Sequence, residues 1–383
     1  MRIGFDATVL TQERTAEANY LVKLVRGLIR ENPRLEIVLF APDKICVDYD
    51  PWINFPQVTR RDPHISRVER KKWAAFNLPR LAKENAIDVL HLPAGVRTRL
   101  FRSPCPVVIT IHDLTPWLRP GVIVGFWRNF RYKLRALIWT RLADKVLTVS
   151  ESAKKDIARL CCLPEANITV VYPGADDIHP DVPTKEEDAG HLKRWHLDGK
   201  RYIICPSGLS AKRRNLDLVL NGFAQFLRQA GEDAVLVFTG SVMKHEGAFE
   251  RTQRKIDMLG LHERVIITGY LADKALKIVT ANAEAAIVTS FYEGFPAPVI
   301  ECFSCGVPVI ATARGAIPEV AGDAAILIEP YDPRGLAEAL ARILGNSAEH
   351  SVYVQKGIDR AKAFSWEKLA GEILKVYTAL VKA

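Results

Sequence analysis

Strand-length apolar runs alternate with helix-length segments along almost the whole chain, and this alternation restricts the possible folds more than any other feature. A parallel strand that is buried on both faces reads as a short run rich in Val, Ile and Leu, and a crossover, usually helical, must precede the next strand. The runs lie at Ile3–Val9, Glu36–Ala41, Asp88–Leu92, Val107–Ile111, Lys145–Val149 and Ile168–Val171 in the first half, and at Tyr202–Cys205, Val235–Thr239, Val265–Thr268, Ala285–Thr289, Val307–Ala311 and Ala325–Ile328 in the second. The pattern predicts an α/β protein with two doubly wound domains.

Length and a shift in composition predict where the domains divide. A chain of 383 residues with 48% apolar content can form two domains, each with its own core. The stretch from Asp176 to Lys200 is acidic, polar and contains proline, which is typical of a linker. We therefore expect a first domain over residues 1–178, a linker over 179–200, a second domain over 201–362 and a C-terminal helix over 363–383.

Apolar run length and cysteine usage bear on the compartment. No run approaches the roughly 18 apolar residues of a membrane span, and the first ten residues predict a strand rather than a signal peptide. Seven cysteines, without the spacing of a disulfide framework, fit a reducing compartment. The C-x-x-C pair of Cys302 and Cys305 has no second pair nearby to complete a zinc site, so we favour core packing over metal or redox chemistry. We expect a cytoplasmic protein.

The stretch over residues 290–315 holds the clearest candidate site. Glu293 and Glu301 lie eight positions apart across a predicted junction of strand, loop and helix, with Pro298 in the first helical turn and Gly306 after the last. Open α/β sheets bind ligands beyond the carboxyl ends of their strands, where a helix N-terminus offers free N–H groups. The junction is therefore a candidate ligand site.

Carboxylates and amide donors occur together at this junction. Glu293 lies beside the N–H groups of Gly294 and Phe295, while Glu301 projects from the predicted helix. Two acceptors and several donors suit a polyol such as a sugar. An isolated pair of glutamates at this spacing would more often be a solvated loop residue and a helix-face residue, so the flanking motifs must decide.

A second candidate site is the loop after the first strand of the second half. Gly208 allows close approach of the backbone to a ligand, and Lys212, Arg213 and Arg214 precede a helix for which Asn215 is the expected N-cap. Positive charge at a helix N-terminus favours anions such as phosphates. The alternative is a loop with three solvated charges.

The net charge of +9 is unevenly distributed. Residues 1–175 carry 28 Lys and Arg against 17 Asp and Glu, whereas the rest of the chain carries 25 against 27. Within residues 51–141 the ratio is 17 to 5. A basic patch attracts nucleic acid or anionic lipid, but no nucleic-acid motif accompanies this one, so we expect no nucleic-acid partner.

One basic segment, over residues 126–141, predicts an amphipathic helix on anionic lipid. Large apolar side chains recur there at helical spacing, and basic side chains lie among them. The apolar positions are Trp127, Phe130, Leu134, Leu137 and Ile138, and the basic ones are Arg128, Arg131, Lys133 and Arg135. The alternative is a helix that packs on the core with a solvated basic face.

Motifs in order along nearly the whole chain resemble those of the retaining, nucleotide-sugar-dependent glycosyltransferases of family 4. They are ITIHDLTPW from Ile109, TVSESAKKDI from Thr148, VVYPGAD from Val170, GLSAKRRN from Gly208, the glutamate pair, and ARGAIPEVAGDAAILIEPYDP from Ala313. The resemblance implies the GT-B fold, in which two Rossmann-like domains face each other across a cleft and a C-terminal helix crosses back to the first domain. It also implies hexose transfer from a nucleoside diphosphate without an obligatory metal.

The resemblance assigns roles to individual residues. Glu293 would hold hydroxyls of the donor sugar, and Glu301 those of the ribose. Arg214 falls where the family usually has a lysine that contacts the diphosphate, and His112 would face the anomeric carbon from the first domain. These assignments make His112, Arg214 and Glu293 the expected catalytic residues.

Other donor contacts are less specific. Tyr270 and Leu271 follow a strand end and are candidates for contact with the base, and Gly208, Gly294 and Phe295 would lie along the donor.

The sequence departs from the family pattern at two places. Leu209 stands where many members have an arginine, so the second phosphate contact falls to Lys212 or Arg213, which the sequence does not rank. The first strand-to-helix loop, Leu10 to Tyr20, has no glycine, although many relatives have glycines there.

We expect a retaining enzyme that moves mannose from GDP-mannose to a lipid-linked saccharide, peripherally attached to the cytoplasmic face of the membrane. The alternatives are a UDP-sugar-dependent transferase, an epimerase of the same fold, and a non-catalytic saccharide-binding subunit. In the transferase, the leaving phosphate would accept the acceptor's proton on the front face of the sugar.

Overall fold

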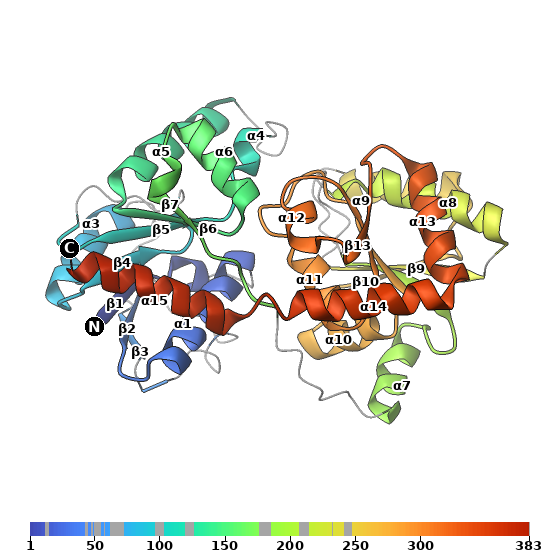
Figure 1. Ribbon diagram of the computed structural model, residues 1–383, viewed down its shortest axis with the longest axis horizontal. Coiled ribbons are helices and arrows are strands. Elements are labelled where there is room, and N and C mark those ends of the chain that lie inside the picture. The colour runs from blue at the N-terminus through green and yellow to red at the C-terminus, as the bar shows by residue number, and fades with distance from the viewer. Residues whose placement is uncertain are drawn as a thin grey trace. The chain divides into compact units, whose positions relative to one another are not determined.

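The protein forms two compact units in a computed structural model (Figure 1). The structure describes residues 1–11, 15–42, 45–46, 49, 55–56, 58–61, 73–95, 103–118, 126–175, 185–206, 214–231, 233–240 and 247–382. Unit 1 comprises Met1–Gly174 together with Phe364–Ala383, and unit 2 comprises Ala175–Ala363.

Each unit contains one parallel sheet. The seven-stranded sheet of unit 1 has the order β3-β2-β1-β4-β5-β6-β7, and the six-stranded sheet of unit 2 has the order β10-β9-β8-β11-β12-β13, as far as the described residues show. The strands of unit 1 are β1 (Arg2–Asp6), β2 (Glu36–Phe40), β3 (Val58–Arg61), β4 (Val89–Leu92), β5 (Val107–Ile111), β6 (Lys145–Thr148) and β7 (Ile168–Val170). Those of unit 2 are β8 (Arg201–Cys205), β9 (Ala234–Thr239), β10 (Val265–Gly269), β11 (Ala285–Val288), β12 (Val309–Thr312) and β13 (Ala325–Ile328).

Helices flank both sheets, which confirms the predicted doubly wound α/β class. Unit 1 contains η1 (Thr8–Thr11), α1 (Ala16–Glu31), α3 (Trp73–Glu84), α4 (Thr115–Leu118), α5 (Phe126–Leu142), α6 (Glu151–Cys161), η6 (Glu165–Asn167) and α15 (Trp366–Lys382). Unit 2 contains α7 (Lys185–Arg194), α8 (Leu216–Ala230), α9 (Ala248–Met258), α10 (Asp273–Ala281), α11 (Ala297–Ser304), α12 (Ile317–Ala321), α13 (Pro333–Gly345) and α14 (Ser347–Ala361).

The strand order reverses at one point in each sheet. In unit 1 the chain moves from β1 outward to β2 and β3 and then returns to β4 on the other side of β1; in unit 2 the same reversal separates β8 from β11. The loops that leave the two strands at such a point run in opposite directions and open a crevice at their carboxyl ends. In unit 2 this crevice is therefore expected between the loops after β8 and β11.

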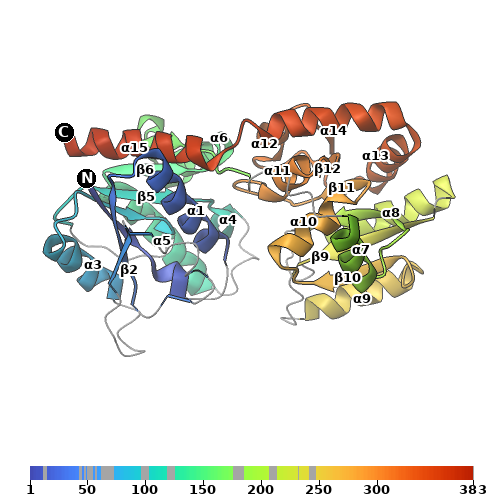
Figure 2. The same ribbon diagram turned by 90° about the horizontal axis from the view of Figure 1, so that it is seen from below.

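The C-terminal helix α15 packs on α1 in unit 1, as both views show (Figures 1 and 2). Gly27 of α1 allows this close approach, because a Cβ atom there would lie 2.8 Å from the carbonyl oxygen of Trp366 and 2.9 Å from the Cβ of Ala370. The edge of the Tyr20 ring also faces Trp366, with ring centroids 6.0 Å apart. The last helix thus belongs to the core of the first unit although 189 residues of unit 2 precede it.

A buried hydrogen-bonded chain joins α15 to the sheet. His91 of β4 contacts the Tyr377 hydroxyl through Nδ1 at 2.5 Å and the Thr110 hydroxyl through Nε2 at 2.7 Å, and all three side chains are fully buried. Burial lowers the pKa of His91 to about 3, and the nearby His112 adds to this effect. The imidazole is therefore neutral at physiological pH, with one nitrogen donating and the other accepting.

Three local features differ from the sequence-based expectations. The first strand ends at Asp6 instead of Val9, because the Asp6 carboxylate accepts hydrogen bonds from the backbone N–H and the hydroxyl of Thr8 and turns the chain into η1. Strand β3 was not predicted, since its sequence VTRR has no apolar run. The expected linker contains helix α7, which belongs to unit 2.

Candidate functional site

The candidate site lies at the carboxyl ends of β8 and β11, where the strand order of unit 2 reverses. Arg214 lies in the segment that joins β8 to α8, and the loop between β11 and α11 carries Ser290 and Glu293. Two sequence segments 76 residues apart are thus brought into hydrogen-bonding contact at the crevice.

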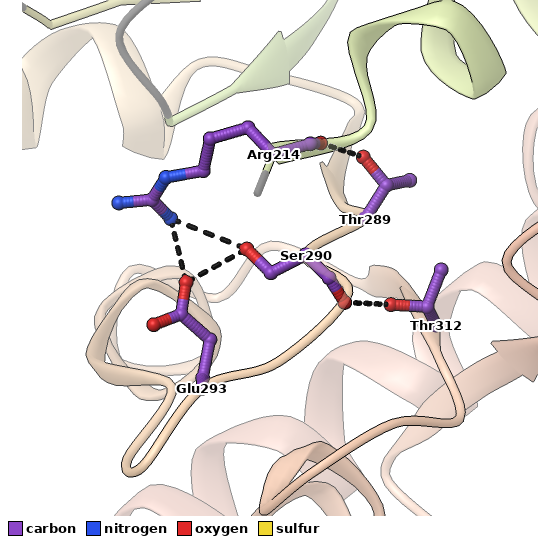
Figure 3. Close-up of polar contacts among 5 residues, drawn as sticks. All are labelled: Arg214, Thr289, Ser290, Glu293 and Thr312. Carbon is purple, nitrogen blue, oxygen red and sulfur yellow. Dashed lines mark hydrogen bonds and ion pairs between the residues drawn. The ribbon is translucent and has the colours of Figure 1, made fainter. Parts of the chain in front are cut away.

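Three side chains form a compact polar cluster, which we call the Arg214–Ser290–Glu293 cluster (Figure 3). The Arg214 guanidinium donates from Nη1 to Glu293 Oε1 at 2.9 Å, and the Ser290 hydroxyl donates to the same oxygen at 2.7 Å. Arg214 Nη1 also lies 3.4 Å from Ser290 Oγ. The Glu293 side chain is only 8% exposed and that of Arg214 18%, so the charges are paired where water has little access.

Two threonine hydroxyls fix the backbone around the cluster. Thr289 donates to the carbonyl oxygen of Arg214 at 2.8 Å, and Thr312 at the end of β12 donates to the carbonyl oxygen of Ser290 at 2.7 Å (Figure 3). Both threonines are buried. The positions of Arg214 and Ser290 are therefore held by main-chain contacts as well as by the ion pair.

Gly315 closes the cluster from the β12–α12 side. It adopts a left-handed backbone with φ of 57°, and a Cβ atom there would lie 2.9 Å from the carbonyl oxygen and 3.0 Å from the nitrogen of Glu293. The next residue, Ala316, donates its backbone N–H to the Glu293 carbonyl oxygen at 3.1 Å. A side chain at position 315 would push the Glu293 backbone away and disturb the cluster.

Asn215 begins α8 as predicted, but its side chain does not cap the helix. The residue has a left-handed backbone with φ of 53°, and its side-chain amide donates to the carbonyl oxygen of Pro330 at 2.6 Å. It thereby ties the start of α8 to the loop after β13. Sequence alone gives N-capping as the default for this position, whereas a contact between distant loops replaces it.

The other expected residues of the β11–α11 region lie as the motif predicts. Pro298 lies in the first turn of α11, and Gly306 follows the helix with a φ of 71°. Gly294 is buried and Phe295 half-buried in the loop, and the half-buried Glu301 lies on α11.

The remaining donor-side residues are placed only in part. Tyr270 and Leu271 follow β10; the Tyr270 side chain is 63% exposed, whereas Leu271 is buried, so Tyr270 is the accessible one of the two. Gly208, Lys212 and Arg213 lie outside the described residues.

His112 belongs to unit 1 and follows the end of β5, as expected. Its Nε2 lies 2.9 Å from the carbonyl oxygen of Pro93, which makes Nε2 the donor and fixes that tautomer in the neutral ring. The ring is half-buried, and its edge-to-face partner is Tyr20 at 4.7 Å between centroids. The half-buried ring is thus held by a hydrogen bond and a ring contact.

The predicted lipid-facing residues lie on α5. Arg131 is exposed, Arg135 is half-buried, and Lys133 lies over the Trp117 ring at 5.4 Å from its centroid. The side chain of Arg128 lies outside the described residues.

The C-x-x-C pair lies on and just after α11. Cys302 is fully buried, and burial raises its pKa well above the ordinary value; burial raises the pKa of Cys305 as well. All seven cysteines are free. Both thiols of the pair are therefore protonated at neutral pH, as core packing requires. Within the described ranges, no group of three or more His, Cys, Asp and Glu side chains is arranged to hold a metal ion.

Sequence reasoning missed Ser290, Thr289 and Thr312. Ser290 begins the stretch over residues 290–315, and each threonine follows or ends an apolar strand. A hydroxyl at the carboxyl end of a buried strand was the available signal, but such residues are also common where a strand merely ends.

Comparison with known proteins agrees with the geometry. The family model for glycosyl transferases group 1 matches residues 190–360, and the model for glycosyltransferase family 4 matches residues 18–178. Together the two glycosyltransferase models cover most of the chain, one in each unit. The chain belongs to the family 4 glycosyltransferases.

The individual relatives share low sequence identity with this chain. The chain is 28% identical over 240 residues to O-antigen chain mannosyltransferase B of Escherichia coli, a match that covers 62% of this chain and 61% of that protein. It is 35% identical over 130 residues to MMP alpha-(1->4)-mannosyltransferase of Mycolicibacterium hassiacum, which covers 33% of this chain and 32% of that protein. The matches thus span from a third to about three fifths of these relatives.

Solved structures share the whole architecture. The Anabaena protein HepE in complex with UDP-glucose has a TM-score of 0.78 at 16% identity, over 99% of this chain and all of that chain. At this identity the likeness establishes the fold, which confirms the expected GT-B class.

Proposed function

We propose that the protein transfers a hexose from a nucleotide sugar to a lipid-linked saccharide with retained anomeric configuration, with GDP-mannose as the first donor to test. The reaction takes place at the cytoplasmic face of the membrane and needs no bound metal. Two mannosyltransferases among the relatives, one of them named for the O-antigen chain, support the choice of sugar and acceptor.

The Arg214–Ser290–Glu293 cluster is the observation that carries the proposal. Breaking the glycosidic bond of a nucleotide sugar develops negative charge on the diphosphate, which a fixed cation stabilises best where water has little access. Arg214 supplies such a cation, because its guanidinium is mostly buried and its backbone is held by Thr289. Glu293 supplies an acceptor for sugar hydroxyls next to that cation.

The ion pair also compensates both buried charges. Glu293 pairs with Arg214, so neither charge is buried alone. A donor whose diphosphate contacts Arg214 and whose hydroxyls contact Glu293 gives each group a second partner. We propose that Glu301 holds the ribose and that His112 of unit 1 contacts the sugar near its anomeric carbon.

A UDP-sugar is the alternative donor, because the Anabaena neighbour was solved with UDP-glucose. Tyr270 is the accessible side chain at the proposed base subsite, and an aromatic ring stacks on either base. GDP- and UDP-sugars are therefore compared side by side.

A panel of GDP- and UDP-sugars tests the proposal through thermal stabilisation and slow donor hydrolysis. A bound donor raises the melting temperature by mass action, and GDP-mannose is expected to give the largest shift and to be hydrolysed. A larger melting-temperature shift with a UDP-hexose would identify that sugar as the donor and leave the proposed reaction class unchanged. Stabilisation by free saccharides alone, without hydrolysis of any nucleotide sugar, would instead identify a saccharide-binding subunit.

A further inference from the structure

Helix α5 of unit 1 presents large apolar side chains to solvent. Trp127 is 71% exposed, and Phe130, Leu134, Ile138 and Leu142 are each at least 42% exposed. Most other exposed large apolar side chains of the described chain are scattered over unit 2. A surface cluster of this kind on one helix requires a partner or a function.

The five side chains lie on one face of the helix. At about 100° per residue, positions 127, 130, 134, 138 and 142 fall within an arc of about 120°. We call this arc the α5 apolar face. Ala136, Trp139 and Thr140 lie on the opposite side and are buried, so the core of unit 1 holds the helix with its apolar face outward.

The charges of α5 indicate which kind of partner the α5 apolar face binds. Residues 126–142 contain five Arg and Lys and no Asp or Glu. Arg131 and Arg141 fall within the same arc as the exposed apolar side chains, and both are exposed. A second copy of the chain would bring two such cationic faces together, which like-charge repulsion opposes. The surface of an anionic membrane suits both features, because its apolar interior buries the apolar side chains and its negative headgroups pair with the arginines.

We infer that the α5 apolar face inserts shallowly into an anionic lipid surface, with Arg131 and Arg141 at the level of the headgroups. The inference rests on the proposed function, because attachment of unit 1 at the membrane supplies the lipid-linked acceptor. Among the described helices none is long and apolar enough to cross a membrane. The contact is therefore an in-plane helix whose polar backbone bonds stay satisfied.

The structure changes which residues make the contact. Leu137 was expected on the apolar face, but it is partly buried and packs against the core, whereas Leu142 takes part in the face. Lys133 points toward Trp117 of α4, away from the exposed arc. Four of the five apolar side chains expected from the sequence thus remain on the exposed face, and Arg131 and Arg141 lie in the same arc.

Vesicle sedimentation tests whether the apolar side chains of α5 contribute to lipid binding. The wild-type protein is expected to bind vesicles that contain anionic phosphatidylserine, and the Trp127→Ser/Phe130→Ser variant is expected to bind them about tenfold more weakly or worse. Met258 and Val352 of unit 2 are similarly exposed, so Met258→Ser/Val352→Ser is the matched control and should bind like wild type. Equal loss in both double variants, or none in the α5 variant, would overturn the inference.

A second pair of variants tests which side of α5 faces the lipid surface. Arg131→Gln should weaken binding to the anionic vesicles about fivefold, while Lys133→Gln, which removes a charge outside the arc, should weaken it less. Lipids brominated near the glycerol backbone should quench wild-type tryptophan fluorescence more than that of Trp127→Phe. Equal quenching, or a wild-type dimer that the Trp127→Ser/Phe130→Ser variant dissociates, would show that the face does not insert.

Donor hydrolysis in the same preparations separates this inference from the proposed function. The Trp127→Ser/Phe130→Ser variant should hydrolyse donor at the wild-type rate, because the donor cluster lies in unit 2. Normal hydrolysis without wild-type lipid binding refutes the lipid inference alone. Lipid binding without hydrolysis of any nucleotide sugar refutes the proposed function alone.

Discussion

The two units bury different kinds of polar groups, charged groups in unit 2 and neutral groups in unit 1. In unit 2 the carboxyl ends of β8 and β11 hold a charged pair, Arg214 and Glu293, with Ser290 as its neutral partner. In unit 1 the buried chain of Tyr377, His91 and Thr110 is neutral. One region keeps charges where a ligand would reach them, and the other uses hydrogen bonds inside the core.

We propose that this difference separates a region that serves function from a region that serves stability. A buried ion pair adds little to stability over an apolar substitute, so its presence at a strand-order reversal is better explained by ligand binding. A fully satisfied neutral network fixes a unique packing without the cost of burying charge. We therefore expect changes in the Arg214–Ser290–Glu293 cluster to act on turnover, and changes in the chain of Tyr377, His91 and Thr110 to act on the free energy of unfolding.

The largest expected effect is the loss of the charge at Glu293. Glu293→Gln keeps the shape and an acceptor oxygen but removes the charge, and it should lower turnover by at least about a hundredfold, the scale for one fixed transition-state contact. Steady-state rates with the identified donor measure it. Glu338→Gln on α13 removes the exposed partner of Arg334 and is the matched control, expected at wild-type rates.

Alanine variants are poorer tests of the same contact. Glu293→Ala leaves Arg214 buried without its acidic partner, which destabilises a protein by about 3–5 kcal/mol in comparable sites. A low rate in Glu293→Ala would then mix catalysis with folding. A near-normal rate in folded Glu293→Gln is the result that would remove the cluster from the mechanism.

The second prediction concerns stability in acid. The pKa of His91 is about 3 in the folded chain against 6.5 in the unfolded one, so the unfolded state binds the proton first as the pH falls. The stabilisation from neutral His91 is complete above pH 6.5 and is lost between 6.5 and 3, at up to about 1.4 kcal/mol per pH unit. The wild type should therefore lose about 3 kcal/mol more than His91→Gln between pH 7.5 and pH 4.5.

Urea unfolding followed by tryptophan fluorescence measures this difference. Six of the seven tryptophans lie in unit 1, at positions 52, 73, 117, 127, 139 and 366, so the signal reports mainly on that unit. Donor hydrolysis by His91→Gln at pH 7.5 is the control and should match the wild type. An equal acid response in both proteins would show that His91 is not the buried neutral base described above.

The third prediction compares the two glutamates of unit 2. Glu301→Ala should raise the KM for the donor about tenfold with little change in kcat, because a ribose contact is similar in the ground and transition states. Initial rates over a donor concentration series give both constants. A fall in kcat at unchanged KM would assign Glu301 to the reacting end of the donor instead.

The smallest effect is expected from chelation. With Arg214 as the fixed cation at the cluster, incubation with EDTA and dialysis should leave kcat unchanged within about twofold. Rates before and after treatment measure it, with a metal-dependent transferase treated in parallel as the positive control. Loss of activity that Mg²⁺ or Mn²⁺ restores would show that a metal takes part.

Much of the fold could be predicted from the sequence because strand runs and helix caps are local signals. The helix from Pro333 to Gly345 follows Asp332, whose side chain accepts from the N–H of Gly335, and its last residue is a glycine, both of which are helix-end signals visible in the sequence. Strand β3 could not be predicted, since an edge strand with the sequence VTRR owes its pairing to β2 and not to its own pattern.

The site was predictable at the level of motifs but not of contacts. The glutamate spacing located the β11–α11 junction, and the basic loop located Arg214. That Arg214 and Glu293 pair directly, and that Ser290 shares the same oxygen, depends on two loops meeting at the strand-order reversal. The Asn215 side chain shows the same limit, because its partner Pro330 lies 115 residues away.

Calorimetric titration tests the central claim most directly, with the donor and its nucleoside diphosphate each titrated into wild type, Glu293→Gln and Arg214→Gln. We predict that Glu293→Gln weakens binding of the nucleotide sugar at least about tenfold but leaves binding of the nucleoside diphosphate unchanged, because we propose that Glu293 contacts only the sugar. Arg214→Gln should weaken the binding of both the nucleotide sugar and the nucleoside diphosphate. Unchanged affinity of Glu293→Gln for the nucleotide sugar, or of Arg214→Gln for the nucleoside diphosphate, would contradict the assignment of this cluster as the donor site.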